Sequence, residues 1–329
     1  MLEEYKKHVA ERAKLNIPPL PLSADQTSEL VNLLKNDHEE ADYLLNLFKE
    51  RIPAGVDQAA YVKAAFLTDI TTGKTESPHI SKVDAVKVLG TMLGGYNIQP
   101  LINCLKDEEL AGEASKVLSK TLLIFDAFNE IFELSKENSH AKKVIEEWAN
   151  GSWFTEKEDI KEQIKLTVFK VTGEINTDDL SPAPDAWSRP DIPLHALAMF
   201  KMPRTGLDDP LGTIEKLKEK GNPLVFVGDV VGTGSSRKSA TNSVLWHMGD
   251  EIPFIPNKKE GGYCFGGKIA PIFFNTLEDS GAFPIEMNVS KMITGQEIIL
   301  EPYKGRVIDA NSLEVLSEFK LKTDVLLDE

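Results

Sequence analysis

The stretch LVFVGDVVGTGSSRKSA, residues 224–240, decides how the second half of this chain is interpreted. Its first part is a short apolar run bounded by glycine, which is typical of a buried strand. Gly232 and Gly234 follow, and they allow the backbone to turn tightly or to approach a ligand closely. Ser235 or Ser236 then stands where the N-cap of a helix belongs. The stretch therefore predicts a strand, a glycine-rich turn and a helix.

The same turn has the features of an anion site for a small ligand. The first N–H groups of the helix and its dipole favour negative charge, and the planar guanidinium of Arg237 suits a carboxylate or a phosphate. A Walker A loop and a dinucleotide fingerprint both require a glycine at the position that Arg237 occupies, so the stretch fits neither motif well. A tight turn with a capping serine is the structural alternative, but it leaves the second serine and the arginine unexplained.

Outward from this stretch, short β-rich runs alternate with at least two helices, a pattern that indicates a mixed α/β domain. We expect strands at residues 166–171, 224–228, 269–274 and 297–300, a possible edge hairpin at 307–310 and 317–321, and helices near 236–249 and 275–281.

A second segment, residues 173–190, reads GEINTDDLSPAPDAWSRP and is expected to form a loop. Arg189 is a further candidate clamp for a carboxylate. Asp178 could orient a serine or pair with an arginine, although a solvated Asp-Asp turn is the simpler reading of Asp178 and Asp179 taken alone. Lys268, in a third segment after a glycine pair, is interpreted as structural.

Residues 1–155 follow a different pattern, with apolar side chains at helical spacing and short breakers between them. About eight helices fit this stretch, and their number and length favour a HEAT-like array of stacked helical pairs. Ser23 with Gln26, and Ser81 with Asp84, precede two of the helices as capping patterns. The array is either a packed domain only or also a docking or dimerisation surface.

The chain is thus predicted to be a multidomain α and α/β protein. It would have a helical domain at 1–155, a charged linker at 156–165 and a mixed α/β domain at 166–329. Its 329 residues contain no apolar run of the roughly 20 residues that cross a bilayer, and no secretory signal is expected. The net charge of −15 is not that of a typical nucleic-acid-binding protein.

Cys104 and Cys264, the two cysteines of the chain, are too few and too far apart for a disulfide framework, a thiolate zinc site or a self-contained iron–sulfur site. A reducing cytoplasm is the natural compartment. The histidines lack ligand spacing and are interpreted as surface or structural residues, so no metal site is expected. They are His8, His38, His79, His140, His195 and His247.

Taken together, these segments resemble the N-terminal region of the aconitase B family, most specifically at residues 171–193, 227–249 and 266–275. The resemblance implies a HEAT-like domain followed by a swivel domain, which closes over a [4Fe–4S] cluster carried by later domains. It also implies the isomerisation of citrate to isocitrate through cis-aconitate. Whether citrate or 2-methyl-cis-aconitate is preferred is left open.

The resemblance also implies roles for single residues. The Gly-Ser-Ser-Arg signature makes Ser235 the catalytic base, and it makes Ser236 and Arg237 contacts of a substrate carboxylate. Arg189 matches a further substrate-binding arginine, and Asp178 matches an aspartate of the substrate loop. Asp179 stands where the other aconitase branch has a histidine, so its role is open.

Because the family's cluster cysteines belong to later domains, the resemblance implies that this chain is a fragment that neither binds the cluster nor turns over citrate alone. Its partners would be the tricarboxylate substrate and the cluster-bearing domains, with a possible homodimer through the helical domain. Two alternatives remain: an interaction or dimerisation module, and a separate small subunit of a split hydro-lyase. Weak or absent RNA binding is expected from the negative charge.

Overall fold

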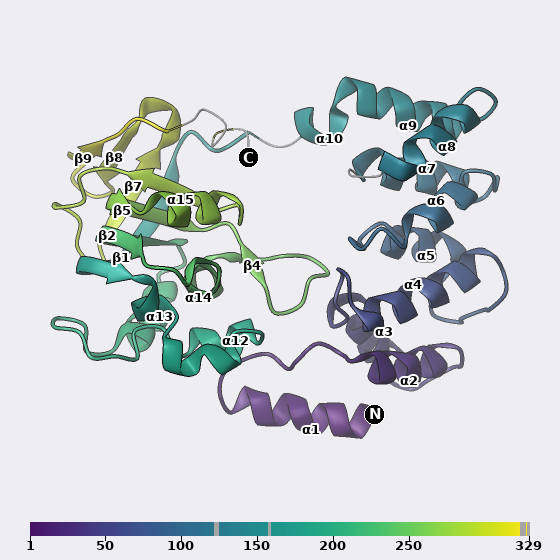
Figure 1. The fold of residues 1–329 in the computed structure, drawn as a ribbon, viewed down its shortest axis with the longest axis horizontal. Helices are drawn as coiled ribbons and strands as arrows, with labels where there is room; N and C mark the ends of the chain where they lie inside the picture. Colours follow the sequence, from purple (N-terminus) through teal and green to yellow (C-terminus); the bar gives the residue numbers. More distant parts are fainter. Residues whose placement is uncertain (122–124, 157–158, 323–326, 328–329) are drawn as a thin grey trace. The chain divides into compact units, whose positions relative to one another are not determined.

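A computed structural model describes residues 1–121, 125–156, 159–322 and 327 (Figure 1). Contacts divide the chain into two compact units, Met1–Glu158 with Pro253–Pro256, and Asp159–Ile252 with Asn257–Glu329. Residues 157–158 of the predicted linker, and Asp328 and Glu329 at the acidic end, lie outside the described residues. The two units are a helical unit and an α/β unit, which confirms the predicted fold class.

The helical unit contains ten helices within its described residues, including one short helix of a single turn. They are α1 (Leu2–Ala13), α2 (Ala24–Leu34), α3 (Ala41–Glu50), α4 (Gln58–Thr71), α5 (Lys82–Leu89), α6 (Ile98–Cys104), α7 (Ala111–Lys120), α8 (Phe125–Leu134), α9 (Ser139–Asn150) and α10 (Ser152–Thr155). Neighbours in sequence pack in pairs, and helices two apart, such as α5 and α7, also contact each other. Figure 1 shows the resulting stack of helices from α2 to α9.

Local signals and an apolar core account for these helices. Ser23 and Gln26 form the predicted capping box at the start of α2, and Ser81 caps α5 by accepting the N–H of Asp84. Leu30, on α2, is fully buried in the core of the helical unit. Since the caps satisfy N–H groups that would otherwise lack partners, they fix where α2 and α5 begin.

The α/β unit is built on a seven-stranded sheet with the order β6-β5-β2-β1-β7-β8-β9. Strands β1 (Ile164–Asn176), β2 (Leu224–Thr233), β5 (Tyr263–Ile269) and β6 (Phe283–Glu286) run parallel. The others, β7 (Glu297–Glu301), β8 (Arg306–Asp309) and β9 (Val315–Glu318), are antiparallel, so the predicted edge hairpin is confirmed. A separate two-stranded ribbon pairs β3 (Asp250–Glu251) with β4 (Lys259–Glu260).

Helices follow the parallel strands and cover the sheet. Helix α14 (Arg237–Met248) follows β2 and packs on it, and α15 (Pro271–Glu278) contacts β2 and β6. Three helices and a 3-10 turn connect β1 to β2. They are α11 (Thr177–Leu180), the 3-10 turn η1 (Ala183–Ser188), α12 (Ile192–Ala196) and α13 (Pro210–Lys218). A second 3-10 turn, η2 (Pro302–Lys304), separates β7 from β8.

The prediction of a strand at residues 269–274 was wrong. The strand β5 ends at Ile269, and α15 begins at Pro271 rather than near residue 275. Proline fixes its own φ and needs no N–H partner in the first helical turn, so Pro271 starts the helix. The apolar run that suggested a strand is divided between the end of β5 and the first turn of α15, where Phe273 and Phe274 enter the core and Ile272 is exposed.

Among the described residues, no helix combines the length and apolar character needed to cross a membrane.

Candidate functional site

Two loops that are separated by more than forty residues in sequence meet at the carboxyl ends of β1 and β2. The strands are parallel neighbours, and Asn176 at the end of β1 is paired with Thr233 at the end of β2. The segments that follow are the two for which the sequence predicted chemistry, residues 173–190 and 232–240. The carboxyl edge of a parallel sheet is the usual place for a ligand.

The two predicted glycines are required by this close approach. Gly232 has φ +81°, and a Cβ there would lie 2.2 Å from the ring of Phe273. Gly234 has φ +109°, and a Cβ there would lie 2.5 Å from Oγ1 of Thr177. That hydroxyl oxygen in turn accepts the N–H of Ser236 at 3.2 Å. Gly234 therefore allows the end of β2 to rest directly on α11.

The N-cap position of α14 is occupied by Ser236, but its side chain does not cap the helix. Its Oγ instead accepts a hydrogen bond of 3.0 Å from Nη2 of Arg189. A capping serine normally stabilises a helix by about 1 kcal/mol, and here that bond is replaced by a contact between the two loops. The structure thus brings Arg189 and Ser236 together and leaves the first turn of α14 without a side-chain cap.

Arg189 is half-buried, and one of its N–H groups is available to a ligand. Its Nη2 also donates to the carbonyl oxygen of Ser181 at 3.5 Å, whereas its buried Nε has no hydrogen-bond partner among the described residues. An unpaired buried donor is costly, on the order of 1–3 kcal/mol, unless a ligand or water pairs with it. This arrangement suits a bound carboxylate.

Ser235 and Arg237 flank Ser236. The Ser235 side chain is exposed and that of Arg237 is half-buried, and neither makes a hydrogen bond or an ion pair with any described residue. Arg237 is the first residue of α14. A hydroxyl and a guanidinium are therefore both available to a ligand beside an uncapped helix start, where the dipole favours an anion.

The two adjacent aspartates of α11 differ in their surroundings. Asp178 is exposed, and within the described chain its carboxylate forms neither an ion pair nor a hydrogen bond, so the considered pairing with an arginine or a serine is not seen. Asp179 accepts the N–H of Asn176 and pairs with Arg204, whose Nη1 lies 3.2 Å away. Arg204 also donates to the carbonyl oxygens of Thr172 and Glu174. Asp179 therefore has a structural role, which the sequence left open.

Lys268, on β5, is exposed and makes no hydrogen bond with a described residue. It lies opposite Val230 of β2, before the strand ends.

Sequence reasoning missed a buried polar chain behind the two loops. Nε2 of His195 lies 2.8 Å from Oγ of Ser181, which donates to Oγ of Ser239 at 2.7 Å. Nδ1 of His195 lies 2.8 Å from Oγ of Ser188. Burial and the charge of Arg189 lower the pKa of His195. The available signal was a histidine within the apolar run Pro-Leu-His-Ala-Leu, where a buried imidazole needs partners.

The residues present do not fit an iron–sulfur cluster. Cys104 and Cys264 belong to different units, both are buried, and burial raises the pKa of the Cys264 thiol to about 12. A cluster is held by several thiolates that converge on it. No three His, Cys, Asp or Glu side chains gather as a metal site in the part of the chain that the structure describes.

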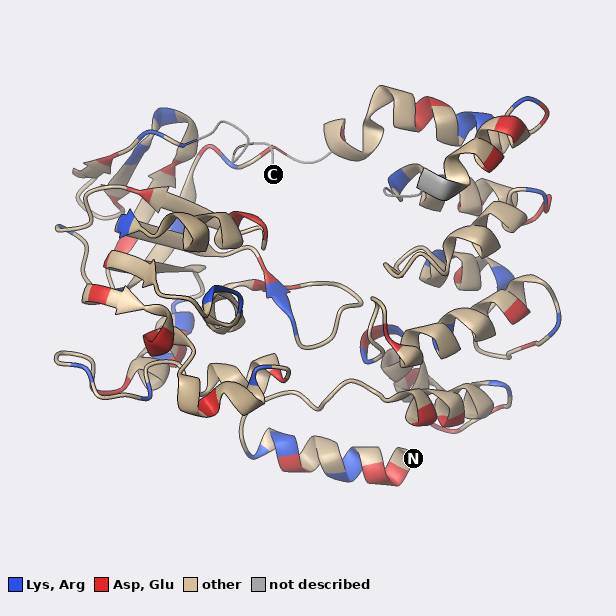
Figure 2. Cartoon of the chain, viewed as in Figure 1, with Lys and Arg blue, Asp and Glu red and all other residues tan. Residues whose placement is uncertain are grey.

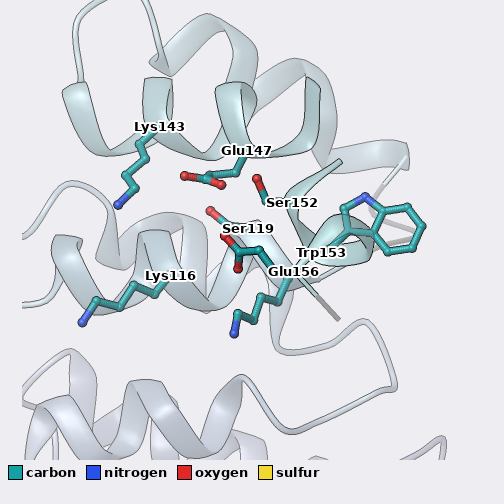
Figure 3. A pocket seen from close by; sticks show the side chains of 8 residues that line it. Lys116, Ser119, Lys143, Glu147, Ser152, Trp153 and Glu156 are labelled. Atoms are coloured by element: carbon teal, nitrogen blue, oxygen red, sulfur yellow. The ribbon is translucent and has the colours of Figure 1, made fainter. Parts of the chain in front are cut away.

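A pocket of about 160 Å³ lies in the helical unit between α7, α9 and α10 (Figure 3). Its lining carries both charges, with the carboxylates of Glu147 and Glu156 toward its centre and lysine side chains around them. The lining residues are Lys116, Ser119, Lys120, Lys143, Glu147, Ser152, Trp153 and Glu156. Since the charges oppose each other, the lining selects neither an anion nor a cation.

Lysine and arginine residues are interspersed with aspartate and glutamate along the helices and loops of both units in the view of Figure 2. Acidic residues outnumber basic ones in the full sequence, and the net charge is −15. Short-range donors, such as Arg189 and Arg237, must then capture any anionic ligand, because the overall field repels it.

Two family models match this chain, and together they span nearly all of it. The model described as the aconitate B N-terminal domain matches residues 4–154, and the model described as the aconitate hydratase 2 N-terminus matches residues 166–329.

Curated relatives agree with these models. The chain is 58% identical over 338 aligned residues to aconitate hydratase B of Escherichia coli and 57% identical over 338 to that of Pseudomonas aeruginosa. The whole chain is covered in both alignments, but it spans only 39% of the length of each relative. The aconitate hydratase B of Helicobacter pylori is 52% identical, with 38% of its length covered.

One solved structure, a 3-isopropylmalate dehydratase from Methanocaldococcus jannaschii, is similar at 20% identity and a TM-score of 0.35, over 48% of this chain and 83% of that one. That likeness is too low to bear on the fold. The two family models and the curated relatives carry the assignment: the chain belongs to the aconitate hydratase B family and corresponds to the N-terminal region of its members.

Proposed function

We propose that the α/β unit is the swivel domain of an aconitase and that it supplies the proton-transferring serine and the carboxylate-binding arginines for citrate–isocitrate isomerisation. The helical unit would be the HEAT-like domain, with the boundaries 1–155, 156–165 and 166–329. The observation that carries the proposal is the 3.0 Å hydrogen bond from Arg189 to Ser236. It joins two candidate loops at the expense of the helix cap.

In this proposal, Arg189, Ser236 and Arg237 hold substrate carboxylates. A guanidinium and a carboxylate form strong charge-assisted hydrogen bonds, and the unpaired Nε of Arg189 gains a partner when an anion binds. Ser235 Oγ takes the proton from the substrate carbon. A serine is a weak base, so the nearby Arg237 and the start of α14 must stabilise its deprotonated form.

Asp178 is proposed to contact the substrate or a residue beside it, because its exposed carboxylate has no partner among the described side chains. The [4Fe–4S] cluster of the family would be bound elsewhere, since the donors of this chain do not suit it. The buried free thiols of Cys104 and Cys264 support a reducing, cytoplasmic compartment.

The test uses a joined enzyme, in which this chain is fused to the part of Escherichia coli aconitate hydratase B that the alignment leaves uncovered. Formation of cis-aconitate from citrate is followed by its ultraviolet absorbance. Ser235→Ala is expected to lower kcat by at least about 100-fold, since a proton-transferring group contributes roughly that much or more. Arg189→Lys is expected to raise KM, because lysine lacks the planar fork.

Lys238→Ala is the matched control. Lys238 is the exposed cation next to Arg237 in the first turn of α14, and it makes no bond to a described residue. Its removal is expected to leave kcat and KM close to those of the unmodified enzyme. Unchanged kcat in Ser235→Ala would refute the role of Ser235, and equal losses in all three variants would indicate damage to the fold.

Self-association of the helical unit is a second candidate function, and exposed aromatic side chains favour it. Phe128 and Phe132 are each 44% exposed and stack on each other, and Phe128 also stacks on Trp148. Light scattering on the whole chain, with and without Phe128→Ser and Phe132→Ser, tests this. A monomer in the unmodified chain would count against a homodimer through this surface.

A further inference from the structure

A buried imidazole lies between the two loops of the proposed site. His195, on α12, is 2% exposed. Its two ring nitrogens contact the hydroxyls of Ser181 and Ser188, which belong to the loop that follows β1. Among the described residues, no hydrogen bond joins His195 to a candidate substrate residue, so its hydrogen bonds act on the site through these serines.

The hydrogen bonds on the Nε2 side form one consistent chain of donors and acceptors. Ser239 donates its hydroxyl hydrogen to the carbonyl oxygen of Ser236 at 3.1 Å, so its Oγ can only accept from Ser181. Ser181 has then used its own hydrogen and must accept one from Nε2–H of His195 at 2.8 Å. This arm therefore runs from His195 to the backbone of Ser236, the N-cap residue of α14.

The Nδ1 side leads to the arginine. In a neutral ring with Nε2 protonated, Nδ1 is an acceptor. The hydroxyl of Ser188 lies 2.8 Å from Nδ1 and 2.7 Å from the carbonyl oxygen of Asp185, and its single hydrogen can be donated to only one of them. Ser188 immediately precedes Arg189, whose Nη2 donates to Oγ of Ser236. Both arms therefore converge on Ser236, one through its carbonyl oxygen and one through its side chain.

We propose that His195 is a positioning residue, which in its Nε2–H tautomer holds Arg189 and the first turn of α14 in a fixed position relative to each other. The inference rests on the proposed function, because Arg189 and Ser236 are substrate contacts only under that function. One imidazole would thus couple the binding of the substrate carboxylate by Arg189 to the position of Ser235.

The electrostatic surroundings of the ring favour its neutral form. Burial, followed by the positive charge of Arg189, lowers the pKa of His195, while the carbonyl and the carboxylate of Asp185 oppose this shift. A protonated ring would donate at Nδ1 as well, and the single hydroxyl hydrogen of Ser188 would then go to the carbonyl oxygen of Asp185, 2.7 Å away. In the proposed neutral tautomer, Ser188 donates that hydrogen to Nδ1 instead.

Two substitutions separate the arms, because each amide reproduces one ring nitrogen. His195→Gln places an N–H near Nε2 and keeps the arm to Ser181, while it removes the acceptor of Ser188. His195→Asn places an oxygen near Nδ1 and keeps the arm to Ser188, while it removes the donor to Ser181. In the joined enzyme, we expect His195→Gln to raise KM and His195→Asn to lower kcat, each by about 5- to 10-fold for one lost hydrogen bond.

Serine variants provide an independent check if a histidine variant folds poorly. Ser188→Ala should reproduce the higher KM of His195→Gln, and combining the two should add little, because both break one link. Ser181→Ala should likewise reproduce the lower kcat of His195→Asn. The matched control is His247→Gln, since His247 is also buried but bonds the carbonyl oxygen of Ala196. It should lower Tm without separating KM from kcat.

The tautomer itself can be measured in the 329-residue chain without any activity. Nitrogen NMR of histidine-labelled protein should show His195 protonated at Nε2 and bare at Nδ1 near neutral pH, with the signal assigned by its loss in His195→Gln. A ring protonated at Nδ1 only, or the same change in kcat and KM for both His195 variants, would overturn the inference. If kcat or KM changes in Ser235→Ala and Arg189→Lys but not in the His195 variants, only the inference about His195 fails. If Ser235→Ala and Arg189→Lys retain normal kcat and KM, the proposed function fails.

Discussion

Replacement of Gly234 by alanine tests how the two loops of the site are held together. The new Cβ would lie 2.5 Å from Oγ1 of Thr177, a residue that is 1% exposed. Relief requires Thr177 to rotate, which breaks its bond to the N–H of Ser236. Alanine is also strained at φ +109°.

The expected cost follows from these two parts. The positive φ contributes about 1–2 kcal/mol, and the collision with the lost hydrogen bond adds about 1–3 kcal/mol. We therefore expect Gly234→Ala to reduce the free energy of unfolding of the α/β unit by about 2–5 kcal/mol. Gly221→Ala is the matched control, since Gly221 has φ +77° with no atom within 4 Å of the added Cβ. It should show the strain alone.

A double-mutant cycle isolates the collision. In a Thr177→Ala background the nearest atoms to the new Cβ are the nitrogen and Cβ of residue 177, at 3.5 and 3.6 Å, which are ordinary contacts. The cost of Gly234→Ala should then fall to that of Gly221→Ala. Hydrogen exchange of the buried β2 amides measures the unfolding free energy of this unit. Equal costs in both backgrounds would refute the packing argument.

Three further predictions concern charged groups. Hydrogen bonds from Lys304, Gln163 and Arg306 lower the pKa of Glu301 to about 2. The stability that this carboxylate provides is therefore present above its unfolded pKa of 4.5 and is lost as pH falls toward 2. In urea titrations, Glu301→Gln should reduce the fall in unfolding free energy over this pH range. Burial lowers the pKa of Lys63 to about 8, so stability should rise between pH 8 and 10.5 as the folded state sheds the buried charge; Lys63→Met should stabilise the chain at pH 7 and lose that advantage above pH 10.5. Burial also lowers the pKa of His247, so the unfolded chain takes up a proton near pH 6.5 that the folded chain resists. Thermal unfolding should show stability declining below that pH, and declining less in His247→Gln. A difference in stability between the two proteins that does not change with pH would contradict this.

The sequence was sufficient where the signal is local. Ser23 and Gln26 cap α2 because side chain and backbone partners lie three residues apart, and Gly232 and Gly234 predicted the turn because few other residues adopt its backbone angles. The same local reasoning failed at Pro271, where an apolar run served a buried helix face as well as it would a strand. Periodicity alone does not separate these cases in a short segment.

The candidate residues Ser235, Ser236 and Arg237 could be named from the sequence because they are adjacent in it. What Ser236 does could not be named, because its partner Arg189 is forty-seven residues away and competes with a local cap. The links from Ser181 to His195 and to Ser239 span 14 and 58 residues, respectively. Sequence determines which donors and acceptors exist and where elements begin, but the parallel pairing of β1 with β2 decides which of them meet, because only packing brings distant loops within hydrogen-bond distance.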